Sequence, residues 1–131
     1  MWWRRRYAGL SRKQLGRLGE RLGARFLRRR GYRIVARNYT CPAGEIDLVA
    51  LDGPSIVFVE VKSLRGDAAA NPEDAVNFHK RRQITAVART YLLQTGAQNH
   101  ACRFDVIAVV LKEGCQPEIE HFIDAFGPTR R

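Results

Sequence analysis

Two short apolar runs separated by four residues constrain the fold of this chain more than any other feature. Residues 44–51 and 56–62 are rich in valine, isoleucine and leucine, and residues 52–55 between them read Asp-Gly-Pro-Ser. Apolar runs on either side of a Gly/Pro turn predict a β-hairpin. Because proline has no N–H to donate to a strand ladder, Pro54 belongs in the turn.

The four-residue turn also predicts which side chains oppose each other across the hairpin. Counting back from the turn places Asp47 opposite Glu60, and one step further out Glu45 opposes Lys62. Opposed side chains share a face, with Cβ atoms about 5 Å apart. Two carboxylates that close repel each other unless a cation lies between them, and hard oxygen ligands suit Mg²⁺ or Mn²⁺. For Glu45 we expect a salt bridge to Lys62, with a second metal ligand as the alternative.

Strand alternation predicts how these charged residues face. Glu60 and Lys62 project to the same side of their strand, and Asp47 projects to the side opposite Ile46 and Leu48. Charged groups among buried apolar neighbours are costly unless they are paired or bound to metal. The hairpin therefore predicts a metal site, with Lys62 placed to position or deprotonate a water.

The rest of the chain is expected to supply two helices and three further strands. A helix is predicted over residues 12–30, with Ser11 as its N-cap, and a second over 73–94, whose regular part begins at Phe78. Strands are predicted over residues 32–39, 103–111 and 118–124, and a loop over 63–72.

The order αβββαββ predicts an α/β fold with a mixed central β-sheet flanked by helices. With 131 residues, the chain suits one domain. We place this domain at residues 11–126, between a basic, disordered tail at 1–10 and a short C-terminal tail at 127–131.

Basic residues are concentrated at one end of the chain. Residues 1–37 carry 13 Lys or Arg against a single acid, Glu20, whereas the remaining 94 residues carry 10 bases and 12 acids. A basic end on a near-neutral body favours a polyanionic partner, either nucleic acid or an anionic membrane surface, over a merely solvated helix face.

The cysteines and the N-terminus indicate a reducing compartment. Cys41, Cys102 and Cys115 show no paired spacing, which argues against a disulfide framework or a thiolate zinc site. The start Met-Trp-Trp-Arg-Arg-Arg has the charge of an export signal, but no apolar run follows it. No stretch approaches a membrane span. We expect a cytoplasmic protein.

The hairpin motif has a known counterpart. Asp47, a gap of twelve residues and then Glu60-x-Lys62 resembles the core of the PD-(D/E)XK nuclease superfamily. The fuller pattern is similar to the YraN-like family of small bacterial proteins, whose fold resembles that of archaeal Holliday-junction resolvases. The matching pieces are Gly19-Glu20, residues 44–50, residues 57–62, Pro72 with Ala75-Val76, Lys80-Arg81-Arg82, and residues 103–106.

The resemblance implies a restriction-endonuclease-like fold and roles for four residues. Asp47 and Glu60 would ligate Mg²⁺ or Mn²⁺, Lys62 would serve the attacking water, and Glu20 would be an accessory acid from the first helix. Glu20 lies on the flank of that helix's apolar stripe, which supports this role. The proline that classically precedes the aspartate is replaced here by Ile46.

Further basic side chains are candidates for nucleic-acid contact. For Lys80, a contact to phosphate and a snorkelling position both stay open, and for the neighbouring arginines a solvated face is the alternative. The candidates on the two helices are Arg17, Arg21, Lys80, Arg81 and Arg82. We expect Asp105 to be a structural hydrogen-bond partner, and the three histidines to be structural or exposed.

Two functions remain open from the sequence. The first is metal-dependent cleavage of DNA, selective for branched or flapped structures. The second is a nucleic-acid-binding scaffold that keeps the nuclease fold without turnover, in DNA processing or RNA metabolism; a peripheral membrane protein is a weaker third reading. A homodimer also stays open, because resolvase-like cleavage of paired strands needs a two-fold axis.

Overall fold

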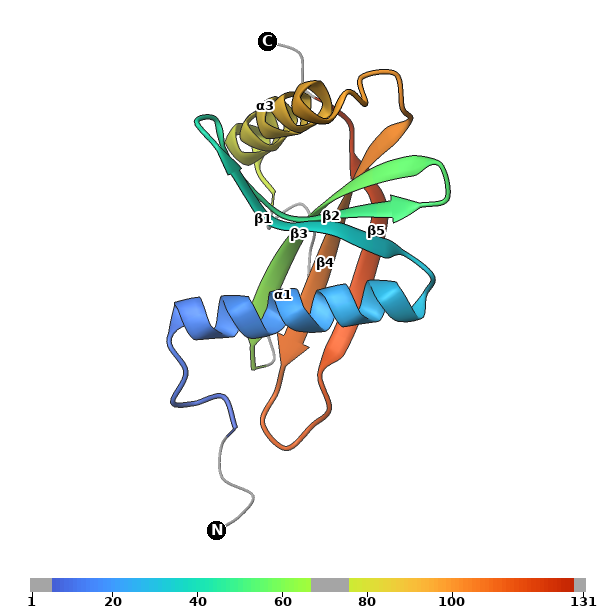
Figure 1. Ribbon diagram of the computed structural model, residues 1–131. Helices are drawn as coiled ribbons and strands as arrows, with labels where there is room; N and C mark the ends of the chain where they lie inside the picture. Colours follow the sequence, from blue (N-terminus) through green and yellow to red (C-terminus); the bar gives the residue numbers. More distant parts are fainter. Residues whose placement is uncertain (1–5, 67–75, 129–131) are drawn as a thin grey trace.

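The computed structural model describes residues 6–66 and 76–128, which fold into two helices and one five-stranded sheet (Figure 1). In chain order the elements are α1 (Arg12–Arg29), β1 (Arg33–Cys41), β2 (Gly44–Asp52), β3 (Ser55–Arg65), α3 (Phe78–Thr95), β4 (Cys102–Leu111) and β5 (Glu118–Phe126). The predicted order αβββαββ is confirmed.

The strands lie in the sheet in the order in which they occur in the chain. β1, β2 and β3 form an antiparallel meander, β4 runs parallel to β3, and β5 is antiparallel to β4. A parallel pair needs a crossover connection, and α3 supplies it between β3 and β4. The sheet is therefore mixed, as the sequence predicted.

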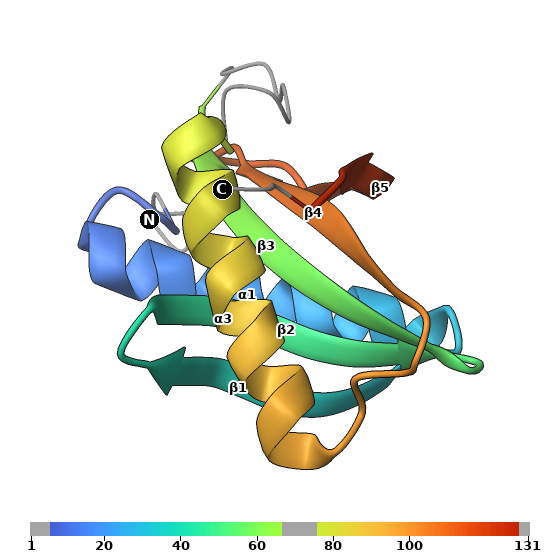
Figure 2. The ribbon, with the colours of Figure 1, turned by 90° about the horizontal axis from the view of Figure 1, so that it is seen from above.

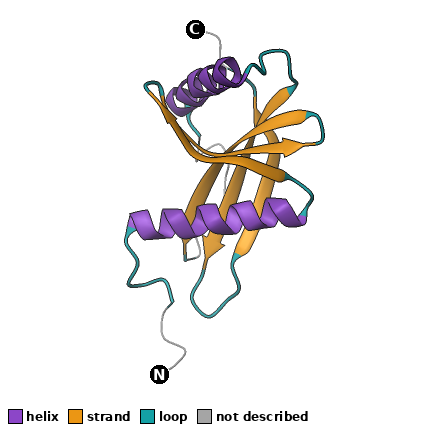
Figure 3. Ribbon diagram, viewed as in Figure 1, coloured by secondary structure: helices purple, strands orange, loops and turns teal. Residues whose placement is uncertain are grey.

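The two helices cover opposite faces of the sheet (Figures 2 and 3). α3 packs through Ile84 and Val87 on a core that includes Phe58 of β3. α1 packs through Ala24 and Leu27 on a second core. β3 serves both layers, since its alternate residues belong to different cores, as expected for a strand buried on both faces.

The predicted hairpin register is confirmed. Leu51 pairs with Ile56, and the ladder continues in step as far as Leu48 opposite Val59. β3 extends to Arg65, further than predicted, and takes in the start of the expected loop. Its last residues pair in parallel with the end of β4, and these long-range bonds cannot be read from the local sequence.

The start of α3 is the other clear difference from the sequence reading. Asn77 is the N-cap, its side chain accepts a hydrogen bond from the Lys80 N–H at 2.9 Å, and the helix begins at Phe78. The described residues before it, Val76 and Asn77, are not helical. The remainder of the expected first turn, 73–75, lies outside the described residues, as does most of the expected loop.

α1 approaches the sheet closely at one glycine. A Cβ added at Gly19 would lie 1.8 Å from the Ser63 Oγ, whereas one added at Gly16 would meet nothing within 4 Å. The Ser63 hydroxyl donates to the Leu15 carbonyl at 3.1 Å, which fixes this contact. Of the three glycines on this helix, Gly19 is the one whose missing side chain brings α1 against β3.

Part of the expected N-terminal tail is instead packed on the domain. Tyr7 is only 2% exposed and belongs to the core under α1. The Glu113 carboxylate accepts hydrogen bonds from the backbone N–H groups of Arg6, Tyr7 and Ala8 at 2.6–3.2 Å. The prediction of a disordered tail is therefore wrong for residues 6–10, and residues 1–5 lie outside the described part.

Among the described residues, 6–66 and 76–128, no helix combines the length and apolar character needed to span a membrane.

Candidate active site

Glu60 of β3 provides the first carboxylate of the candidate site. Its strand neighbours on the same face, Ile56 and Phe58, are buried in the core under α3, and Glu60 itself is only 9% exposed. A charge at such a position requires a partner. Lys80 supplies it from the first turn of α3, with its Nζ 3.1 Å from the Glu60 Oε2.

Asp47 of β2 lies directly beside Glu60. Its Oδ2 accepts a hydrogen bond from the Val61 N–H at 2.8 Å, one residue after Glu60. Burial, together with the neighbouring Glu60 carboxyl, raises the pKa of Asp47 to about 8, against the smaller opposing effects of the Val61 N–H and Lys80. The Asp47 carboxyl therefore keeps its proton to a higher pH than a free aspartate, which is the behaviour of an acid held near another acid in a poorly solvated place.

The predicted alternation of side chains along β2 is wrong at this point. Ile46 lies in the core under α3, whereas Leu48 lies in the core under α1, so these two residues face opposite sides of the sheet. In β1, Asn38 falls between the partners of Ile46 and Leu48 and has a left-handed backbone with φ 50°. Asparagine tolerates this conformation better than most residues. The alternation of side chains along β2 is therefore broken at Asp47, the residue between Ile46 and Leu48.

Glu20 of α1 approaches the same place from the other side. Burial and the charge of Asp47 raise its pKa, with a further contribution from Glu45, while a side-chain hydrogen bond to Asn38 acts in the opposite sense. The helix therefore brings Glu20 within electrostatic reach of the carboxyl pair, where the sequence placed it. Among the described residues, however, no three His, Cys, Asp or Glu side chains gather closely enough to hold a metal ion together.

Lys62 and Glu45 do not form the predicted salt bridge. Both side chains are exposed, and within the part of the chain that the structure describes no ion pair joins them. The pairing of β2 with β3 in the predicted register ends at Leu48 opposite Val59, so the ladder does not hold Glu45 opposite Lys62. Lys80, rather than Lys62, is the cation in contact with the carboxyl pair.

The other predicted basic residues lie on two helical surfaces. Arg17 and Arg21 are exposed on α1. On α3, Arg82 is exposed, with its guanidinium 6.0 Å from the centre of the Phe78 ring. Arg81 is held more firmly, since its Nε donates to the Val76 carbonyl at 3.1 Å.

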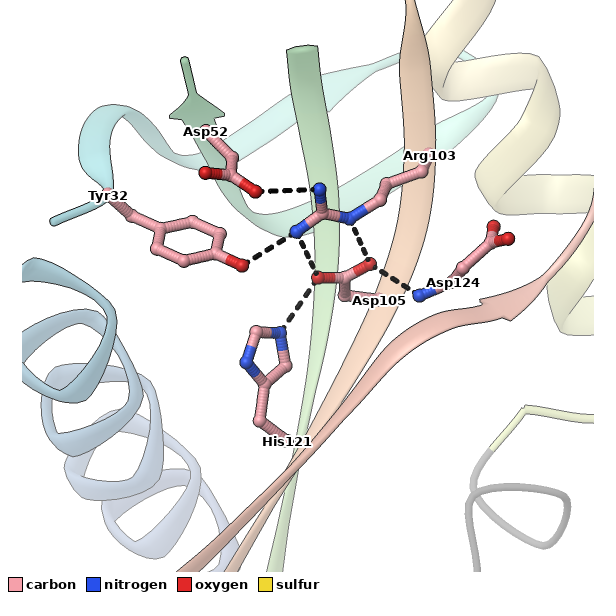
Figure 4. A network of polar contacts seen from close by, with 6 residues as sticks. All are labelled: Tyr32, Asp52, Arg103, Asp105, His121 and Asp124. Carbon is pink, nitrogen blue, oxygen red and sulfur yellow. Dashed lines mark hydrogen bonds and ion pairs between the residues drawn. The ribbon is translucent and has the colours of Figure 1, made fainter. Parts of the chain in front are cut away.

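A second polar cluster lies on the α1 side of the sheet, and sequence reasoning found only part of it (Figure 4). Asp105 is fully buried and accepts hydrogen bonds from Arg103 at 3.0 and 3.2 Å, from the His121 Nε2 at 2.8 Å and from the Asp124 N–H at 2.9 Å. Arg103 also donates to Asp52 and to the Tyr32 hydroxyl.

This cluster links Tyr32, just after the end of α1, to the strands β2, β4 and β5. Burial by itself would raise the pKa of Asp105, but the hydrogen bonds from His121, Arg103 and the Asp124 N–H outweigh it and lower the pKa. Every hydrogen-bond partner of the Asp105 carboxylate is a residue of β4 or β5 inside the folded domain. The expected structural role of Asp105 is therefore confirmed, and His121 shares it. Nothing in the local sequence around Tyr32 or Asp52 signalled that they would meet Arg103.

The sequence was compared with known protein families and with curated proteins. A model described as uncharacterised protein family UPF0102 matches residues 19–109. The chain belongs to this family. A UPF0102 protein of Geotalea uraniireducens (strain Rf4) is 44% identical over 114 residues, which cover 87% of this chain and 90% of the relative. One from Pelotomaculum thermopropionicum is 42% identical over 117 residues, which cover 88% and 98%.

The UPF0102 match confirms the YraN-like resemblance seen in the motifs. The matched range begins at Gly19, the glycine that contacts β3, and includes both carboxyl residues of the pair as well as Glu20 and Lys62. The fold, a single small α/β domain with a five-stranded mixed sheet and two helices, is consistent with a restriction-endonuclease-like architecture.

Proposed function

We propose that this UPF0102 protein is a metal-dependent phosphodiesterase acting on DNA, with a preference for branched or flapped structures. The observation that carries the proposal is the placement of two acids side by side: Asp47 is hydrogen-bonded to the Val61 N–H, next to the buried Glu60, at an irregular point of the sheet. A fold gains nothing in stability from forcing two acids together, so such pairs are characteristic of functional sites.

The donor set fits a hard divalent cation. Asp47 and Glu60 would hold Mg²⁺ or Mn²⁺ through carboxylate oxygens, and remaining positions would go to water and substrate oxygens, as is common for Mg²⁺. The ion would supply charge neutralisation at the phosphate and would acidify water. The raised pKa of Asp47 means that binding of the ion would release the proton of this carboxyl group to solvent.

The neighbouring residues have distinct tasks in this proposal. Lys62, exposed on the same strand two residues after Glu60, would position or deprotonate the attacking water from the solvent side. Glu20 would add negative charge near Asp47 from α1. Lys80 holds the Glu60 carboxylate in place and would be free to contact a phosphate oxygen once a cation takes over that carboxylate.

The distribution of charge supports a nucleic-acid substrate. The exposed side of α1 carries arginines, including Arg17, Arg21 and Arg25, and contacts of this kind position a phosphate backbone without reading its sequence. No sequence-reading module is evident in the described elements, which are the sheet and its two covering helices. This favours recognition of nucleic-acid structure over recognition of a base sequence.

The test is a panel of end-labelled DNA substrates: linear, flapped and four-way, each incubated with Mn²⁺, with Mg²⁺ and with a chelator. We expect metal-dependent cleavage, strongest on the branched or flapped forms. Lys62→Ala should lower the rate at least about 100-fold, the range for loss of a general base, while substrate binding is retained. Glu118→Gln, an exposed glutamate on β5, is the matched control and should cleave normally.

The same structure favours one alternative, a nucleic-acid-binding scaffold without turnover. Glu60 already has a cationic partner in Lys80, and the described residues offer no cluster of three metal-ligating side chains. Binding to all substrates of the panel with no cleavage in either metal would establish this alternative and exclude the enzyme.

A further inference from the structure

Phe78, at the first position of α3, is unusual among the exposed side chains. The large apolar side chains exposed in the described part of the chain are Val35, Phe78, Leu93 and Ile123. Phe78 is the one aromatic among them and is 63% exposed. A single exposed apolar side chain is ordinary on a protein surface, so what sets Phe78 apart is the basic surface around its ring.

The surroundings of the ring are basic. The Arg82 guanidinium lies 6.0 Å from its centre. α3 carries four basic residues and no acidic one over its whole length. Arg82 also lines a cavity of about 330 Å³ together with Ala43, His79 and Gln83, large enough for a small polar group.

The ring also lies at a defined place relative to the carboxyl pair. Lys80, two residues further along the helix, contacts Glu60, and two residues correspond to about 200° around a helix. Phe78 therefore projects from the side of the helix that faces away from Glu60, and the ring and the carboxylate are separated by more than one helix diameter, about 10 Å. At about 3.4 Å per nucleotide, that separation corresponds to a few nucleotides along a strand.

We propose that Phe78 and Arg82 form a stacking platform for an unpaired base of a nucleic-acid strand that passes the Asp47–Glu60 pair. An aromatic face stacks on any base, and a neighbouring arginine adds cation–π and phosphate contacts. Bases in a closed duplex have no free face to offer. The platform thus selects strands with unpaired nucleotides a short way from the carboxyl pair, and it rests on the proposed action on nucleic acid.

The experiment measures binding rather than cleavage, so that it separates the platform from catalysis. Affinity for a labelled single-stranded DNA and for a blunt-ended duplex is measured by fluorescence anisotropy in a chelator. We expect Phe78→Ala to weaken single-strand binding about tenfold, the usual cost of losing one base–aromatic stack, and to change duplex binding less than about twofold. Phe78→Leu should behave as the alanine variant does, and Phe78→Trp should restore affinity.

The matched control is Leu93→Ala, which removes a side chain equally exposed (64%) at the other end of the same helix. It should leave both affinities unchanged. Replacing either exposed side chain should leave the unfolding midpoint nearly unchanged, so all variants are expected to fold.

The outcomes are distinct. Equal loss on single strands and duplex, no loss on either, or no binding by the wild type would overturn the platform. So would a change from dimer to monomer in Phe78→Ala with nucleic-acid binding intact, since a second copy of the chain would then cover the ring. If the wild type binds single strands through Phe78 but cleaves nothing, the platform stands and the nuclease proposal fails. A repeat with an RNA strand decides between the two nucleic acids.

Discussion

At the scale of single residues, the molecule places its acids in two very different environments. Asp105 is fully buried but satisfied by Arg103, His121 and a backbone N–H, and its pKa is lowered. Asp47 is held against another acid, and burial and Glu60 raise its pKa. The first arrangement stabilises the fold; the second is the arrangement expected of a site kept for binding or chemistry.

The structural role of Asp105 predicts a large and pH-dependent loss on Asp105→Asn. Removing the charge leaves Arg103, with a side chain only 19% exposed, without its buried partner, a loss of about 3–5 kcal/mol. Asp52→Asn, at a side chain 45% exposed, is the control and should cost about 1 kcal/mol or less. Urea unfolding at pH 7 measures both.

The sign of the pH effect follows from the lowered pKa of Asp105. Its contribution to stability is complete above the unfolded value of about 3.9 and is lost as the pH falls through the lower folded value. The difference between wild type and Asp105→Asn should therefore shrink as the pH falls below about 4. A difference that stays constant down to pH 3 would contradict the structural role of this carboxylate.

At the scale of secondary-structure elements, the sequence predicted the order, the mixed sheet and the hairpin register, because periodicity and Pro54 are local signals. It missed what depends on distant contacts. β3 extends to Arg65 because β4 pairs with it, and α3 begins only at Phe78 because Asn77 is its N-cap. The sequence placed Asp47 near Glu60, as the structure does, but by an alternation that fails at Asp47, where Asn38 on the neighbouring strand adopts a left-handed backbone.

The glycines of α1 provide a test at this scale. Gly19→Ala would place a Cβ 1.8 Å from the Ser63 Oγ, forcing the hydroxyl away from the Leu15 carbonyl or the helix away from β3; overpacking of this kind costs about 1–3 kcal/mol. Gly16→Ala meets nothing within 4 Å and should be neutral or stabilising by up to about 1 kcal/mol. Thermal or urea unfolding that ranked the two variants in the opposite order would disprove the close approach of α1.

At the scale of the whole molecule, the sheet separates a buried structural network from the candidate site. The network around Asp105 ties the exit of α1 to three strands on one face, whereas Glu60 faces α3 on the other. Asp47 lies next to Glu60, and its charge raises the pKa of Glu20 on α1. Sequence motifs named these three acids, but only the folded sheet shows that Lys80, and not Lys62, contacts the pair.

The central claim is that the Asp47–Glu60 pair catalyses metal-dependent cleavage of DNA. Single-turnover cleavage of one labelled flapped duplex in Mn²⁺, compared between the wild type and Glu60→Gln, tests it most directly. We expect the wild type to cleave, and the chelator to abolish this cleavage. In Glu60→Gln the cleavage rate should fall at least about 100-fold, the size expected when several kcal/mol of transition-state stabilisation disappear. Equal rates for the two proteins, or no cleavage by a wild type that binds the duplex, would contradict it.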